Sequence, residues 1–88
     1  MLNPKAQKKL EEHANNLKIG DRIRLARAIR KVSQPKLAEY IGKTFQQVQK
    51  YEYGTNRVSA AVLVKIAQSL EIDIKFFFED LHGFSKTL

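Results

Sequence analysis

The sequence predicts an all-α protein that folds as one small domain, and three observations lead to this prediction. Its 88 residues are enough for one domain and too few for two. Apolar residues recur three and four positions apart, whereas no segment alternates with period two for more than a few residues. Capping residues and helix breakers follow one another at short intervals, as they do between successive short helices.

Residues 1–17 carry the weakest helical pattern. Asn3 and Pro4 suit the start of a helix, because proline fits a first turn. A thin apolar stripe follows at helical spacing, made of Ala6, Leu10, Ala14 and Leu17. We expect Asn15 and Asn16 to break this pattern, so the segment is either an extra N-terminal helix or a frayed arm.

A stronger helix is expected over residues 18–31. Its apolar stripe and the neighbouring face comprise Ile19, Ile23, Ala26, Leu25 and Ile29. Ser33 can cap the helix that follows, and Pro35 is tolerated in its first turn, where N–H groups lack helical partners. The apolar face of this second helix comprises Leu37, Ala38 and Ile41. Gly42 fits the position just past its end, where φ is often positive.

The next helix starts at a capping box, in which Thr44 is the cap and Gln47 the third residue after it. We expect a short helix over residues 45–53, closed by Gly54. Its inward-facing residues are expected to be Val48 and either Tyr51 or Glu52.

Two further helices complete the predicted fold. Ser59 should cap a helix that runs to about Leu70, and Asp73 should cap a last helix through Leu81. Residues 83–88 then form a loose C-terminal tail.

The charge is concentrated in one part of the chain. Sixteen Lys and Arg residues stand against nine Asp and Glu residues, which gives a net charge of +7. Residues 18–57 hold ten of the basic and three of the acidic residues, so the whole excess lies in this basic block. A basic block with neutral flanks indicates a polyanionic partner, most simply nucleic acid.

Composition and motifs argue against several other classes of protein. Without cysteine the chain can form neither a disulfide framework nor a thiolate-bound metal site, and His13 and His82 are too far apart in sequence to suggest zinc. The sequence has no nucleophile–base pair and no Gly-rich phosphate loop, so we expect no catalytic residue, metal, cofactor or small-molecule ligand. No apolar run approaches the roughly 20 residues of a membrane span, and the first residues lack a signal-peptide pattern, which predicts a cytoplasmic protein.

Two of the expected helices, joined by a tight turn inside the basic block, have the pattern of a helix-turn-helix. The pattern is carried by Ile19-Gly20-Asp21-Arg22-Ile23-Arg24, Arg27, Ser33-Gln34, Leu37-Ala38, Gly42, Val48, Tyr51-Glu52 and Gly54. At these positions the chain resembles the phage-repressor family of DNA-binding domains, the Cro and lambda-repressor type that is also called the XRE family. The resemblance covers about residues 18–80. It implies a compact five-helix domain over residues 18–82 that binds double-stranded DNA as a homodimer and regulates transcription.

In a helix-turn-helix the second helix lies in the major groove, and its first turns reach base edges. The residues expected to read bases are Phe45, Gln46, Gln47, Gln49 and Lys50. Gln can pair with adenine, Lys can donate to guanine, and an aromatic edge can touch a thymine methyl group. Gln47 is assigned to helix capping first and to base contact second.

A second set of residues is expected to contact DNA phosphates, which supply affinity without sequence information. These residues are Gln34, Lys36, Lys43, Thr44, Asn56 and Arg57. For Gln34 the resemblance implies both a phosphate contact and a role in bracing the reading helix. The resemblance also implies that Arg27 and Glu52 form a partly buried ion pair that holds the reading helix without touching DNA.

The expected dimer interface lies on the last helix, at Phe76, Phe78 and Leu81. Three adjacent aromatic side chains on a helix cannot all face one core, and an apolar patch outside the basic block suits contact between two copies. The expected DNA site is a two-fold operator, because a dimer presents two reading helices. The runner-up interface is Leu25 and Ile29, covered by the N-terminal segment.

Two other functions use the same residues. An antitoxin-like regulator would have another protein as its main partner and would bind DNA for autoregulation. RNA binding has less support, because few exposed aromatic residues are interleaved with the basic ones as stacking platforms.

Overall fold

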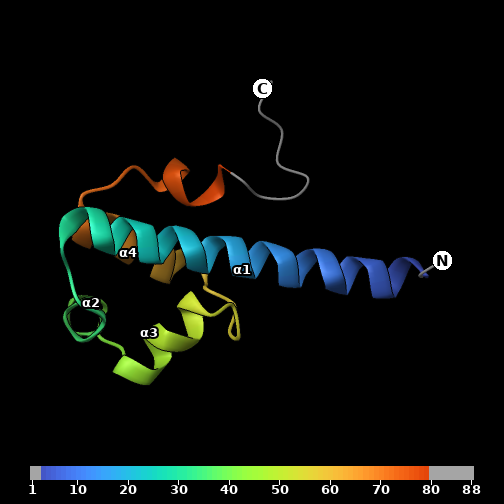
Figure 1. Cartoon of the computed structure of the whole chain (residues 1–88), viewed down its shortest axis with the longest axis horizontal. Helices are drawn as coiled ribbons and strands as arrows, with labels where there is room; N and C mark the ends of the chain where they lie inside the picture. The colour runs from blue at the N-terminus through green and yellow to red at the C-terminus, as the bar shows by residue number, and fades with distance from the viewer. Residues whose placement is uncertain (1–2, 80–88) are drawn as a thin grey trace.

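The computed structural model describes residues 3–79, which form four α-helices and one 3-10 helix and no strand (Figure 1). In chain order these are α1 (Pro4–Arg30), α2 (Gln34–Ile41), α3 (Phe45–Glu52), α4 (Ala60–Leu70) and η1 (Ile74–Phe78). The all-α prediction is therefore confirmed. The fifth helix of the prediction is present as the short η1.

α1 is one continuous helix of 27 residues, so the expected break at Asn15 and Asn16 was wrong. The side chain of Asn3 caps it by accepting a hydrogen bond from the N–H of Ala6 at 2.8 Å. The helix ends only at Arg30, and the next residue, Lys31, adopts the left-handed conformation with φ 56°. Asparagine inside a helix costs only about 0.7 kcal/mol relative to alanine, which a contact with the rest of the molecule can offset. Residues 4–17 are thus the first half of α1 and not a separate helix or arm.

The predicted caps of the middle helices are present. The hydroxyl groups of Ser33, Thr44 and Ser59 each accept from the N–H three residues further on, at 3.2, 3.1 and 3.1 Å. Gly42 ends α2 in the left-handed region with φ 67°. α3 ends at Glu52, one residue earlier than expected.

The last helix is shorter and tighter than expected. Asp73 caps it by accepting from the N–H of Lys75 at 2.9 Å, but the segment is a five-residue 3-10 helix. Its tight winding turns one aromatic ring, Phe77, into the core, where it is fully buried. Leu81 and the predicted tail over 83–88 lie outside the described residues.

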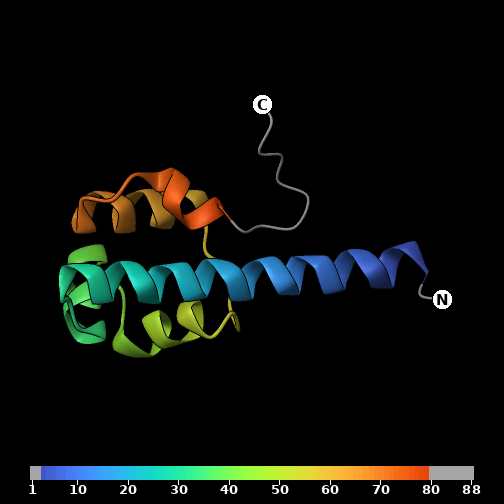
Figure 2. The same ribbon diagram turned by 45° about the horizontal axis from the view of Figure 1, so that its top comes forward.

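The core lies under the C-terminal half of α1. Its largest fully buried apolar side chains come from α1, α2, α3, α4 and η1, and they include Ile23, Leu37, Ile41, Val48, Ile66, Leu70 and Phe77. The N-terminal half of α1 extends past this body, as both views of the ribbon show (Figures 1 and 2). The helix is roughly 40 Å long at 1.5 Å per residue, so it is the longest element of the fold.

Candidate nucleic-acid interface

α3 has one buried and one exposed face, as a helix that lies in a DNA groove requires. Val48, Tyr51 and Glu52 are buried against the body. Of the predicted base-reading residues, Phe45, Gln46 and Lys50 are exposed, and Gln47 and Gln49 are partly buried. Helical spacing places Gln46 and Lys50 together on the outward side, opposite the buried face.

The outward stripe of α3 has a third member, which is not among the predicted base-reading residues. Tyr53 caps the C-terminal end of α3 and is 62% exposed, the highest exposure among the large hydrophobic residues that the structure describes. It follows Gln46 and Lys50 at spacings of four and three residues, which was the signal available in the sequence. A tyrosine here offers both a ring and a hydroxyl group to a ligand.

The predicted phosphate-binding residues lie at both ends of α3. Lys43 and Thr44 are exposed in the turn before it, and Thr44 also caps the helix. Asn56 is partly buried and Arg57 exposed in the loop after it. The guanidinium of Arg57 also lies 4.0 Å from the carboxylate of Glu12 on α1, a contact that the sequence did not predict.

Lys36 lies on the outer side of α2. Its amino group is 3.6 Å from the carboxylate of Glu39 and 5.6 Å from the centre of the Tyr40 ring. A phosphate contact by Lys36 would therefore compete with a neighbouring carboxylate.

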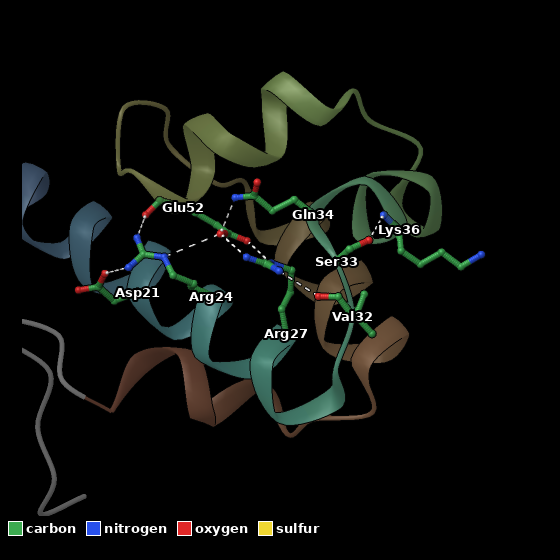
Figure 3. A network of polar contacts seen from close by, with 8 residues as sticks. All are labelled: Asp21, Arg24, Arg27, Val32, Ser33, Gln34, Lys36 and Glu52. Carbon is green, nitrogen blue, oxygen red and sulfur yellow. Dashed lines mark hydrogen bonds and ion pairs between the residues drawn. The ribbon is translucent and has the colours of Figure 1, made fainter.

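Glu52 is the centre of a polar network that joins three helices (Figure 3). Its carboxylate is completely buried and accepts two hydrogen bonds from the guanidinium of Arg27, at 2.5 and 2.9 Å. The third N–H-bearing nitrogen of Arg27 donates to the carbonyl oxygen of Val32 at 2.9 Å, after the end of α1. The ion pair that the resemblance implies is thus present, and it connects α1 to the C-terminal end of α3.

Gln34 belongs to the same network. Its side-chain amide donates to the carboxylate of Glu52 at 2.9 Å, from the first residue of α2 (Figure 3). The resemblance implies that Gln34 both contacts a phosphate and braces the reading helix, and its bond to Glu52 on α3 is a contact of the second kind. Because the amide nitrogen carries two N–H groups, the bond to Glu52 leaves a second donor for a phosphate.

Two glycines let α1 approach the end of α3 closely. A Cβ atom added to Gly20 would lie 2.6 Å from the carbonyl oxygen of Tyr51 and closer still to that of Glu52. A Cβ on Gly54, which has φ 73°, would lie 3.0 Å from the backbone of Leu17. α1 therefore rests directly on the C-terminal end of the exposed helix.

Of the residues predicted to form the dimer interface, the two that the structure describes are only partly accessible. Phe76 and Phe78 are partly buried and pack against the core. The guanidinium of Arg22 lies 3.8 Å from the centre of the Phe76 ring, so one face of that ring already has a partner. Leu81 lies outside the described residues.

The runner-up surface is open. Leu25 and Ile29 are 44% and 50% exposed, and the N-terminal segment does not cover them because it continues the same helix. Leu10 and Leu17 of that segment are themselves 55% and 40% exposed.

Within residues 3–79, no helix is both long enough and apolar enough to cross a membrane.

Comparison with known proteins places this architecture in a family. A family model described as helix-turn-helix matches residues 23–77. The chain is 53% identical over 68 residues to an "uncharacterized HTH-type transcriptional regulator" of Sinorhizobium medicae, a match that covers 77% of this chain and 49% of the relative. It is 45% identical over 69 residues to an "uncharacterized transcriptional regulator in ATPase CF(0) region" of Rhodospirillum rubrum, covering 78% of this chain and 64% of the relative. The chain spans about half the length of most of these curated relatives.

Solved structures show the same fold. The restriction-modification controller protein C.AhdI of Aeromonas hydrophila superposes with a TM-score of 0.71 at 32% identity, covering 75% of this chain and 96% of that chain. The clp gene regulator ClgR of C. glutamicum shares the fold with a TM-score of 0.70 at 22% identity, over 73% of this chain and 83% of that one. By its matched residues and its likeness to C.AhdI, this chain belongs to the helix-turn-helix family.

Proposed function

We propose that the chain is a sequence-specific regulator of transcription that binds double-stranded DNA with α3 in the major groove. The observation that carries the proposal is the exposed face of α3. Gln46 and Lys50 lie side by side on this face, and the opposite face of the helix is buried against the body. The names of the relatives, which call them transcriptional regulators, support the same function.

The outward face of α3 suits contact with bases, and the residues at its two ends suit contact with phosphates. Gln46, Lys50 and Tyr53 would meet base edges or the groove wall, because they point away from the body. Lys43 and Thr44 would hold the phosphates on one side of the groove. Asn56 and Arg57 would hold those on the other side, and Gln34 would add its second N–H.

The functional unit in this proposal is a homodimer on a two-fold operator in the cytoplasm. One α3 helix covers one half-site, and two half-sites one turn of DNA apart require two such helices.

Selection of bound sites from a pool of random duplex DNA tests the proposal directly. We expect enrichment of one sequence, present as a two-fold repeat. The double variant Gln46→Ala/Lys50→Ala should lose that enrichment. A matched double variant on exposed positions of α4, Lys65→Ala/Gln68→Ala, should keep it. No enrichment by the unaltered chain would refute sequence-specific binding.

A further inference from the structure

The N-terminal half of α1 presents two leucines that the described fold leaves largely exposed, although Leu17 also lies against Gly54. Leu10 is 55% exposed and Leu17 is 40% exposed, with Ala14 partly buried between them. Their spacings of four and three residues put all three on one face of the helix. We call Leu10, Ala14 and Leu17 the leucine stripe. It ends at Leu17, which lies against Gly54, and begins at Leu10 in the half of α1 that extends past the body (Figure 2).

We propose that the leucine stripe is a self-association surface, on which α1 of a second copy packs in the antiparallel direction. The proposal rests on the proposed function, because it names the surface that makes the two-fold DNA-binding unit. With the two-fold axis near Ala14, Leu10 of one copy reaches the Leu17 region of the other. The small side chain of Ala14 at the crossing lets the two helices approach closely.

Charges beside the stripe favour the antiparallel pair over a parallel one. Glu11 and Lys18 are seven residues apart, so they lie on the same flank of the stripe at its two ends. In the antiparallel pair Glu11 of each copy lies beside Lys18 of the other, and this happens twice by symmetry. A parallel pair has its two-fold axis along the helices, so Glu11 and Lys18 of the two copies would lie on opposite flanks of the interface and form no such pairs.

The direction of the stripe keeps both α3 helices on one side of the dimer. α3 meets α1 at Gly20, where the carbonyl oxygens of Tyr51 and Glu52 lie against the helix. At about 100° per residue, the stripe lies roughly a quarter turn around α1 from Gly20. A two-fold axis perpendicular to the plane of the paired helices therefore leaves each α3 facing the same way, as a shared DNA duplex requires.

The spacing along α1 also suits DNA. Gly20 is six residues from Ala14, or about 9 Å at 1.5 Å per residue, which sets the near ends of the two α3 helices about 18 Å apart along the pair. Figure 1 shows α3 running from there toward the C-terminal end of α1. Adding half the length of each α3 and the side-by-side offset of the paired helices gives centres roughly 30 Å apart. Half-sites on one face of DNA are about 34–36 Å apart.

Sedimentation of the 88-residue chain, free and on duplex DNA carrying the selected two-fold site, tests the interface. The stripe is small, so we expect weak dimers in the free chain and two copies on the DNA. Leu10→Glu should give monomers and weaken binding to the two-fold site about 100-fold, with helix content by circular dichroism unchanged. Ile29→Glu, an equally exposed position on α1 beyond the pairing, is the matched control and should stay dimeric.

A charge exchange gives a test that does not depend on the leucines. Glu11→Lys and Lys18→Glu should each weaken the dimer, because each brings like charges together across the pair. The double variant Glu11→Lys/Lys18→Glu should restore it, which a purely structural role in one helix would not do.

The outcomes separate this proposal from the proposed function. If Leu10→Glu is monomeric and still binds a single half-site, both proposals stand. If Leu10→Glu stays dimeric while Phe76→Glu separates the copies, the interface lies on η1 and the stripe proposal is overturned. A chain that stays monomeric on two-fold DNA also overturns it. Dimers that bind no DNA would instead refute the proposed function alone.

Discussion

At the scale of single residues, Glu52 decides how firmly the exposed helix is held. A carboxylate with no exposed surface is costly to bury unless its charge and its lone pairs are satisfied. Here Arg27 supplies two hydrogen bonds and Gln34 a third. Removing a donor therefore leaves a charge that water cannot reach.

We predict that Arg27→Ala lowers the free energy of unfolding by about 3–5 kcal/mol, because it strands the buried carboxylate of Glu52. Urea denaturation of Arg27→Ala, Glu52→Ala and the double variant measures the coupling. Strictly additive losses would show that the two residues do not interact. Arg24→Ala is the control. Its side chain is 49% exposed and its guanidinium lies 3.9 Å from the same carboxylate, so its loss should cost about 1 kcal/mol or less.

Single substitutions should also distinguish residues that read bases from residues that anchor phosphates. Gln46→Ala should relax the base preference by about 1–3 kcal/mol for a lost bidentate contact. Lys43→Ala should weaken binding to all sequences alike and lower the salt slope by about one. Competition binding with the selected site and a scrambled duplex distinguishes the two effects. Equal losses on both duplexes for Gln46→Ala would remove it from the base-reading set.

At the scale of elements, local chemistry in the sequence predicted the helix starts and tertiary contact decided the rest. Ser33, Thr44 and Ser59 start their helices as predicted, because a capping hydroxyl acts on an N–H only three residues away. The continuity of α1 could not be predicted in this way. Just past Asn15 and Asn16, Leu17 lies against Gly54, a tertiary contact between residues far apart in the sequence that no local pattern predicts.

For the candidate site too, the sequence predicted the features that depend on local chemistry and missed those that depend on tertiary contact. The exposed face of α3 followed from helical spacing within one short segment. The bond from Gln34 to Glu52 and the ring contact between Arg22 and Phe76 join different elements, and no local pattern announces such pairs. The resemblance to the phage-repressor family supplied the Arg27–Glu52 pair, which periodicity alone did not.

The crossing of α1 and α3 gives a prediction at this scale. Gly20→Ala should destabilise the fold by about 1–3 kcal/mol, because the added methyl group meets backbone carbonyls that cannot rotate away. Gly42→Ala is the matched control, since a Cβ there has no neighbour within 4 Å. Its cost should be limited to the left-handed backbone, about 1–2 kcal/mol. Thermal melts of both variants, followed by circular dichroism, compare the two mechanisms.

The contrast between these glycines should appear in DNA binding too. Gly20→Ala displaces the end of α3 that carries Tyr53, so its affinity for the selected site should fall even at temperatures where the variant is folded. Gly42→Ala leaves α3 seated on α1. If Gly20→Ala melts and binds like the unaltered chain, α1 and α3 do not make the close contact described.

At the scale of the whole molecule, the charge and the shape point to the same partner. The net charge of +7 is carried entirely by the excess of basic residues over residues 18–57. Four of its ten basic residues, Lys36, Lys43, Lys50 and Arg57, lie on α2, on α3 or in the loops at both ends of α3, and the other six lie on the second half of α1 or directly after it. The protruding half of α1 carries both signs and is suited to contact with protein.

The salt dependence of DNA binding tests both the candidate interface and the dimer in one measurement. Each phosphate that a basic side chain neutralises releases a counterion, so the logarithm of the association constant falls linearly with the logarithm of salt concentration. For a dimer that neutralises about 6–10 phosphates, we expect a slope of roughly −5 to −9 on the two-fold site. The monomeric Leu10→Glu variant on a half-site should show about half that slope, because one copy makes half the contacts. Fluorescence titration from low to moderate salt measures both values. A slope near zero for the unaltered chain would refute nucleic-acid binding through the basic block. Equal slopes for the two proteins would show that the second copy adds no phosphate contacts.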